Sequence, residues 1–185
     1  TASIDENSGS TITLTATISG VTDSAVTVAL STSGTATEGT DYGTISDITI
    51  SAGATTGTAT LDPTDDNVYE GDETATIDIS SVSGKSGVTE NSTQQVSVTI
   101  AENESAPTVT LATSATSIAE NAGSSLTLTA TLSVATTADV TVALSTSGTA
   151  TEGTDYTDGS GAIDDIVISA GATTGTVSFT PTDDS

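Results

Sequence analysis

The sequence contains no Cys, His, Trp or Met, and its only basic residue is Lys85. Without Cys the chain has neither a disulfide nor a thiolate metal site. Without His or Cys it cannot assemble a Ser–His–Asp or Cys–His catalytic centre. Its carboxylates could in principle cleave glycosides, but one Phe and three Tyr are too few for the usual aromatic platforms. We therefore expect a protein that is not an enzyme.

Negative charge dominates the composition, with 25 acidic residues and a net charge of -24. Such a chain repels nucleic acid and anionic lipid head groups, so we expect neither as a partner. Apolar runs fall short of the roughly 18 residues that a membrane helix needs, so we expect no membrane insertion. Cations are the expected partners of so many carboxylates.

The remaining composition is that of an ordered β protein. Apolar residues make up 34% of the chain and aromatic residues 2%, and Thr, Ser, Gly, Val and Ile are abundant. The β-branched types among them pack well on a pleated sheet. We therefore expect a thin core of small aliphatic side chains with charge around it.

The chain contains an internal repeat. The fourteen letters ALSTSGTATEGTDY occupy both Ala29–Tyr42 and Ala143–Tyr156, an offset of 143 − 29 = 114. The letters SAGATTGT occupy both Ser51–Thr58 and Ser169–Thr176, an offset of 169 − 51 = 118. The four extra residues fall in the Gly-rich stretch Thr157–Ala162, where insertion into a loop costs little.

A period of this size corresponds to one domain, so the sequence predicts two modules, residues 1–104 and 105–185. On this alignment the first module has its first strand truncated, and the second module lacks its last two strands. We expect either that the natural chain is longer or that a neighbour completes the second module by adding strands. The expected partners are thus neighbouring repeats of the same chain or identical subunits.

Apolar and polar residues alternate along short segments. Ile12, Leu14, Ala16 and Ile18 share one parity and Thr residues fill the other, and the same pattern recurs in residues 26–30, 48–50, 59–61, 75–79 and 96–100. Such alternation is typical of antiparallel strands with one buried face. The fold class predicted is all-β, with tandem immunoglobulin-like antiparallel β-sandwiches of about seven strands per complete repeat.

Acidic residues concentrate in the loops of the first module. They are Glu6, Glu38, Asp41, Asp62, Asp65, Asp66, Glu70, Asp72, Glu73, Glu102 and Glu104. Those that follow odd-numbered strands should converge at one pole of the sandwich. Two carboxylates about 4 Å apart repel by about 4 kcal/mol at an effective dielectric constant near 20, so such a pole favours a bound cation. Oxygen ligands on flexible loops favour Ca²⁺.

Several of these segments together resemble the Calx-beta domain family. The segments are GTATEGTDY, then SAGATTGTATL, then DPTDDNVYEGDETATIDI, and finally VSVTIAENE. The resemblance covers nearly the whole chain and recurs in the second repeat. It implies an immunoglobulin-like sandwich of the kind found in sodium–calcium exchangers, an integrin cytoplasmic tail and large bacterial surface proteins.

The resemblance also implies a set of Ca²⁺ ligands at one pole. In the first repeat the matching positions are Glu6, Asp41, Asp65, Asp66, Glu70, Glu102, Asn103 and Glu104. In the second they are Glu120, Asp155, Asp183 and Asp184. The strongest binders have consecutive Asp residues where this chain has Glu102–Glu104, so we expect one or two ions. Glu73 matches a strand-initiating position of the family and is interpreted as structural.

The function expected from these features is a calcium-binding structural repeat of an extracellular, cell-surface bacterial adhesin, stalk or filament, in which Ca²⁺ stiffens the junction between repeats. Close identity between the copies and a Thr-, Ser- and Gly-rich composition favour this reading. One alternative is a regulatory calcium sensor, as in the exchangers. Another is a carbohydrate- or surface-binding module, suggested by the outward-facing Thr rows.

Overall fold

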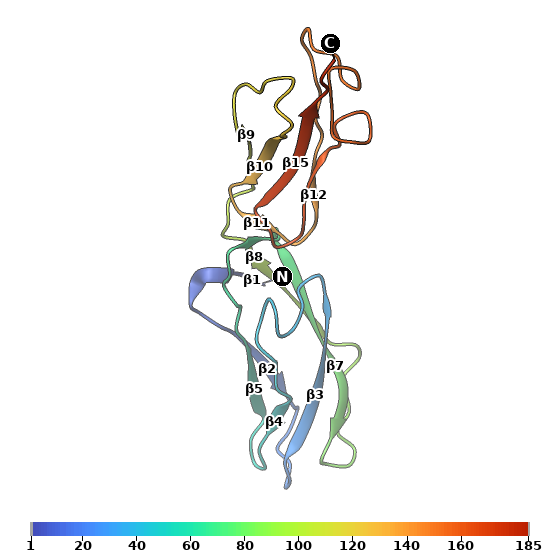
Figure 1. Cartoon of the computed structure of the whole chain (residues 1–185). Helices are drawn as coiled ribbons and strands as arrows, with labels where there is room; N and C mark the ends of the chain where they lie inside the picture. The colour runs from blue at the N-terminus through green and yellow to red at the C-terminus, as the bar shows by residue number, and fades with distance from the viewer. Residues whose placement is uncertain (1, 185) are drawn as a thin grey trace. The chain divides into compact units, whose positions relative to one another are not determined.

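The computed structural model describes residues 2–184, and its alternating segments are strands (Figure 1). The strands up to residue 101 are β1 Ala2–Asp5, β2 Ile12–Thr17, β3 Val26–Gly34, β4 Ile48–Ile50, β5 Thr56–Leu61, β6 Val68–Tyr69, β7 Glu73–Ser83 and β8 Gln95–Ala101. The later strands are β9 Val109–Thr113, β10 Leu126–Leu132, β11 Ala135–Thr136, β12 Val140–Val142, β13 Tyr156–Thr157, β14 Ile166–Ile168 and β15 Thr174–Pro181.

Helical structure in the described residues is limited to the 3-10 turn η1, Glu6–Ser8. Over residues 2–184, no helix combines the length and the hydropathy that crossing a bilayer requires.

The strands fold into two units. The first consists of Thr1–Asp66 with Gly71–Asn103, and the second of Asn67–Glu70 with Glu104–Ser185.

The first unit has two sheets. One contains five strands in the order β1-β8-β7-β3-β4, and the other pairs β2 with β5. All pairs within them are antiparallel except β1 with β8, which run parallel. The all-β, tandem-sandwich fold predicted from the sequence is confirmed, with this one parallel pair inside an otherwise antiparallel arrangement.

The apolar side chains that alternate along the strands point inward and fill the space between these sheets. Leu14 and Leu61 come from the two-stranded sheet, and Val26, Ile50 and Val98 face them from the other. Thr residues alternate with them on the solvent side, for example along Thr13–Thr17. The core is therefore built from aliphatic side chains, as the scarcity of aromatic residues predicts, with Tyr42 as its one aromatic member in the described residues.

The second unit contains the sheet β13-β15-β10-β9, the pair β12-β14, and the pair β6-β11. β10 and β15 align as β2 and β5 do in the first unit. Its buried cluster is smaller and consists of Ala130, Leu132, Ile166 and Ile168.

Burial of these small side chains predicts where the first unit is sensitive to substitution. Ile50 is fully buried, so Ile50→Ala should lower the free energy of unfolding by about 2–5 kcal/mol through lost burial and an unfilled cavity. Thr49→Ala, on the exposed side of the same strand, is the control and should cost less than about 1 kcal/mol. Chemical denaturation measures both, and equal effects of the two substitutions would contradict this account of the core.

Candidate metal centre

The parallel pair β1–β8 brings two acidic residues together at its end. Its register aligns Asp5 with Ala101, so the next residues of the two strands, Glu6 and Glu102, leave the sheet side by side. Glu6 begins the turn η1 and is buried, with 9% of its surface exposed. A parallel register, which needs a long connection between the strands, is thus what joins residues almost one hundred positions apart.

Backbone hydrogen bonds hold Glu102 in position. The Gly71 N–H donates to Glu102 Oε2 at 2.8 Å, and the Glu102 N–H donates to Asp72 Oδ1 at 3.1 Å. Asn103 Nδ2 donates to Asp65 Oδ1 at 3.1 Å. The loops before β6, before β7 and after β8 therefore converge at one end of the first unit, as the sequence predicts.

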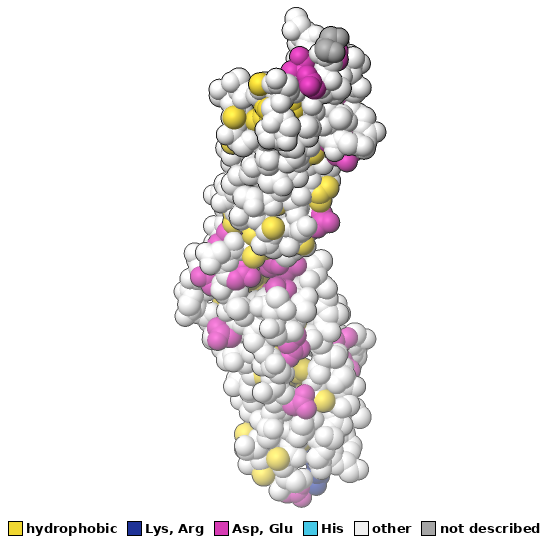
Figure 2. Space-filling view, viewed as in Figure 1, with side chains coloured by type: hydrophobic (Ala, Val, Ile, Leu, Met, Phe, Trp, Pro, Cys, Tyr) yellow, Lys and Arg dark blue, Asp and Glu magenta, His cyan; other side chains and the backbone are white. Residues whose placement is uncertain are grey.

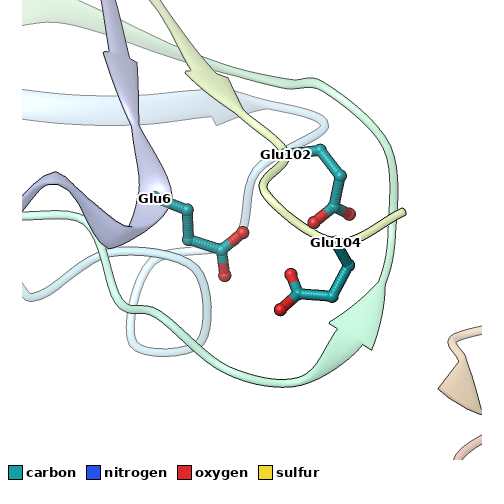
Figure 3. Close-up of side chains that lie close together, drawn as sticks. All are labelled: Glu6, Glu102 and Glu104. Atoms are coloured by element: carbon teal, nitrogen blue, oxygen red, sulfur yellow. The ribbon is translucent and has the colours of Figure 1, made fainter. Parts of the chain in front are cut away.

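Three carboxylates meet at this end. One oxygen from each of Glu6, Glu102 and Glu104 lies within 4.8 Å of the other two. Figure 3 shows the three side chains pointing toward one another, with Glu6 reaching in from the end of β1. We call this set the glutamate cluster.

A second set, which we call the loop cluster, consists of Asp41, Glu70 and Glu73, again within 4.8 Å. Glu73 begins β7, and the next residue, Thr74, is bonded to the loop after β3. The Ala36 N–H donates to the Thr74 carbonyl at 3.1 Å, and the Thr74 N–H donates to Thr35 Oγ1 at 2.9 Å. This link sets the loop that carries Asp41 beside the start of β7.

The repeated TEGTDY letters build that loop from their own hydrogen bonds. The Thr37 N–H donates to Asp41 Oδ2 at 2.5 Å, and the Gly39 N–H donates to the Tyr42 carbonyl at 2.7 Å. Glu38 is fully engaged, because Thr32 Oγ1 and the Ile45 N–H donate to its two oxygens. Glu38 is thus a structural residue of the loop, whereas Asp41 remains next to Glu70 and Glu73.

Tyr42 anchors the loop in the core, with 1% of its surface exposed. Burial raises the pKa of its hydroxyl, and the nearby Glu38 and Asp41 carboxylates raise it further. Tyr42 is thus a core residue of the first unit.

The two clusters have no basic side chain available to neutralise them. Lys85, the only basic residue of the chain, bonds to Asp23 at 2.6 Å and lowers the pKa of that carboxyl. Figure 2 shows acidic side chains gathered at one end of the first unit on the face in view. Partly buried carboxylates this close repel one another by several kcal/mol, and a bound cation would offset that repulsion.

The donor set fits Ca²⁺. Every side chain in the two clusters offers carboxylate oxygen, the ligand type of Ca²⁺, which takes six to eight oxygens in flexible geometry. Zn²⁺ and Cu²⁺ favour His or Cys, which the chain lacks.

The structure brings some of the predicted ligands of the first repeat together and leaves others outside the two clusters. It groups Glu6 with Glu102 and Glu104, and Asp41 with Glu70. Asp65 accepts a hydrogen bond from Asn103, and neither Asp65 nor Asp66 belongs to either cluster. Sequence reasoning set Glu73 aside, yet the structure puts it in the loop cluster; its position at the start of a strand next to an acidic loop is the signal that could have found it.

The predicted ligands of the second repeat do not form a cluster within residues 2–184. Glu120 and Asp155 line the same cavity, whereas Asp183 and Asp184 are exposed. The loop that carries Asp155 has the same internal hydrogen bond as the loop that carries Asp41. The Thr151 N–H donates to Asp155 Oδ2 at 2.5 Å, as the Thr37 N–H does to Asp41 Oδ2.

Three acidic residues outside the pole accept hydrogen bonds from backbone N–H groups. Asp47 accepts a hydrogen bond from the Leu30 N–H at 3.0 Å, and its counterpart Asp165 accepts one from the Leu144 N–H at 2.9 Å. Asp139 accepts one from the Ala170 N–H at 2.8 Å. These three carboxylates thus have structural contacts of their own.

One known protein family matches the sequence of this chain. The Calx-beta domain family matches residues 1–104 and again residues 102–185, which together span the chain. The chain therefore belongs to the Calx-beta domain family. No curated protein matches it in a sequence search.

Three solved structures are similar to the chain. They are CBD12 from CALX1.2 (21% identity, TM-score 0.46, covering 100% of this chain and 73% of that chain), the apo form of the Calx CBD1 domain (24%, 0.46, 56% and 90%), and the calcium binding domain CBD12 of CALX1.1 (20%, 0.45, 99% and 73%). Membership of the family rests on the sequence match rather than on these likenesses.

Because the carboxylates of the glutamate cluster repel one another, removing one of their charges should weaken calcium binding without lowering the stability of the metal-free protein. Glu6→Gln removes one of three adjacent charges, so it should weaken calcium binding at least about tenfold while leaving metal-free stability unchanged or higher. Asp164→Asn, which removes an exposed charge outside both clusters, should change neither. Calorimetric titration and metal-free melting measure the two effects.

Proposed function

We propose that this chain is a non-enzymatic, calcium-binding structural repeat of an extracellular, cell-surface protein of bacteria, an adhesin, stalk or filament. The observation that carries the calcium part is the pair of three-carboxylate clusters in a chain whose single Lys is engaged elsewhere. The long segments that are identical in the two copies, and the Thr-, Ser- and Gly-rich composition, support the structural part, since tandem duplication extends a stalk without requiring new surfaces.

Ca²⁺ would act on the segment that follows β8. Glu102 and Glu104 belong both to the glutamate cluster and to the stretch Glu102–Pro107, which joins the two modules in the sequence. An ion held by both residues and by Glu6 would fix this stretch to the end of β1. Pro107 adds stiffness because its ring fixes φ. Calcium would thus restrict a hinge and turn a flexible string of modules into a rod.

The competing function is a regulatory calcium sensor. The same carboxylate clusters serve it equally well, and affinity separates the two. Extracellular modules bind Ca²⁺ with Kd of about 10⁻⁴–10⁻³ M, whereas sensors bind at about 10⁻⁷–10⁻⁵ M.

Calorimetric titration of the metal-free chain with Ca²⁺ tests the proposal. The structural repeat predicts binding of one or two ions with submillimolar to millimolar Kd. Micromolar binding with a change of shape would favour the sensor, and absence of heat at millimolar Ca²⁺ would refute calcium binding altogether.

Small-angle scattering tests the stiffening. Adding EDTA to the calcium-loaded chain should lower the melting temperature, because a ligand of the folded state stabilises it, and should broaden the distribution of interatomic distances. Glu104→Gln should reproduce the EDTA profile in the presence of Ca²⁺, and Asp164→Asn should not. Identical profiles with and without EDTA would contradict the mechanism.

A further inference from the structure

The sheet that β2 and β5 form in the first unit carries no charge. Residues 8–22 and 51–61, which contain the two strands, have no acidic or basic side chain, although the chain has 25 acidic residues. The corresponding residues of the second unit, 121–138 and 166–182, contain β10 and β15 and are uncharged as well. Each unit thus has one neutral sheet in a strongly acidic chain.

Strand β5 has one free edge. Within residues 2–184 it pairs with β2 alone, and Figure 1 shows the two strands together on the side of the first unit away from β7. The Ile18 N–H donates to the Thr55 carbonyl at 2.9 Å, and hydrogen-bonded pairs alternate along an antiparallel ladder, so Gly57 and Ala59 also bond to β2. The backbone N–H and C=O groups of the alternate residues therefore point away from β2, toward the free edge. These residues are Thr56, Thr58 and Thr60.

The free edge lacks the features by which natural sheets block the addition of another strand. Such features are charged side chains, prolines and bulges. From Thr56 to Thr60 the strand has neither a charge nor a proline, and its register with β2 runs without a shift. The Thr side chains along it are exposed. This edge is therefore open to pairing with a further strand.

The corresponding edge of β15 already accepts a strand at one end. There β13 pairs antiparallel with β15, with Thr157 opposite Thr180. This pairing involves only two residues of β13, and within the described residues the rest of that edge is free. By the same alternation, the residues of β15 that face it are Thr174, Thr176 and Ser178.

We propose that the free edge of β5 binds the same edge of a second copy of this chain, and that the edge of β15 does so in the second unit. Two neutral sheets then join into one across a twofold axis. An antiparallel copy places Thr58 opposite Thr58 and Thr56 opposite Thr60, so each outward N–H meets an outward C=O. Thr–Thr pairs are favourable across strands. Such a self-complementary contact is the commonest basis of association between identical chains.

Charge selects a second copy at this surface. Two chains that each carry a net charge of -24 repel one another wherever their carboxylates meet, so they can approach only along a neutral surface. The neutral sheets provide that surface in both units. Because one strand edge buries little area, we expect a weak contact, with a Kd of about 10⁻⁴–10⁻³ M. The contact goes beyond the proposed calcium role and requires no ion.

Hydrogen exchange measured by nuclear magnetic resonance in EDTA tests the contact. The amides of Thr56, Thr58 and Thr60 should exchange about twofold more slowly at about 10⁻³ M protein than at about 10⁻⁴ M, because a larger fraction is paired. The amides of Gly57 and Ala59, already bonded to β2, should not change. Added NaCl should strengthen the association, since it screens the repulsion between the chains.

Two double variants should abolish the contact by different means. Thr58→Pro with Thr176→Pro removes edge N–H groups that neither β2 nor β10 uses. Thr58→Asp with Thr176→Asp keeps these groups and places like charges opposite each other across the twofold axis. Both should remain monomeric in sedimentation equilibrium at about 10⁻³ M. Thr58→Val with Thr176→Val keeps the N–H groups and the neutral charge, so this matched control should associate as the original chain does.

Several outcomes would overturn the proposal. One is a chain that stays monomeric at about 10⁻³ M in high salt. Another is association that the Asp variants leave intact, and these variants alone decide if the Pro variants do not fold. Loss of association in Thr15→Pro, which removes an N–H on the opposite edge of the sheet, would place the contact on β2 instead. Association that EDTA abolishes would show that calcium bridges the chains.

Discussion

The hydrogen bonding of the β7–β8 hairpin to its two neighbours is the constraint on which the first unit depends. Pairing with β3 extends that strand to Gly34, and pairing with β1 closes the other side of the sheet. The hairpin contributes Ala75, Ile77, Val98 and Ile100 to a core that has few large side chains to offer. Because the core is thin, edge pairing and inward aliphatic residues together determine which segments are strands.

The same hairpin organises the charged pole. The start of β7 supplies Glu73 to the loop cluster, and the end of β8 brings Glu102 and Glu104 to Glu6. Strand ends are well suited to this role, because the sheet fixes the backbone while the side chains that follow it remain mobile enough to adapt to an ion. Fold and site are thus linked: whatever stabilises the hairpin also holds the carboxylates close together, and a cation that relieves their repulsion stabilises the hairpin in return.

Much of this could be predicted from the sequence, and the failures have physical causes. Period-2 alternation identifies β2, β3 and β8, but β6 spans only Val68–Tyr69 and is too short to show a period. Alternation carries no strand direction, so the parallel β1–β8 pair could not be predicted. Glu73 was interpreted as structural because it matches a strand-initiating position of the family, and its proximity to Asp41, which arises from tertiary pairing, is not visible in the sequence. The end of β12 at Val142 could not be predicted from the local sequence, since identical letters continue β3 to Gly34 in the first unit.

The central claim is that tertiary pairing gathers particular carboxylates into cation sites, as opposed to a diffuse acidic surface that attracts ions everywhere. Calcium titration followed by nuclear magnetic resonance of backbone amides tests it residue by residue. The account predicts saturable shifts concentrated around Glu6, Asp41, residues 70–73 and residues 102–104, with little change at exposed carboxylates such as Asp164. Shifts spread evenly over all exposed acidic residues, without saturation, would contradict it.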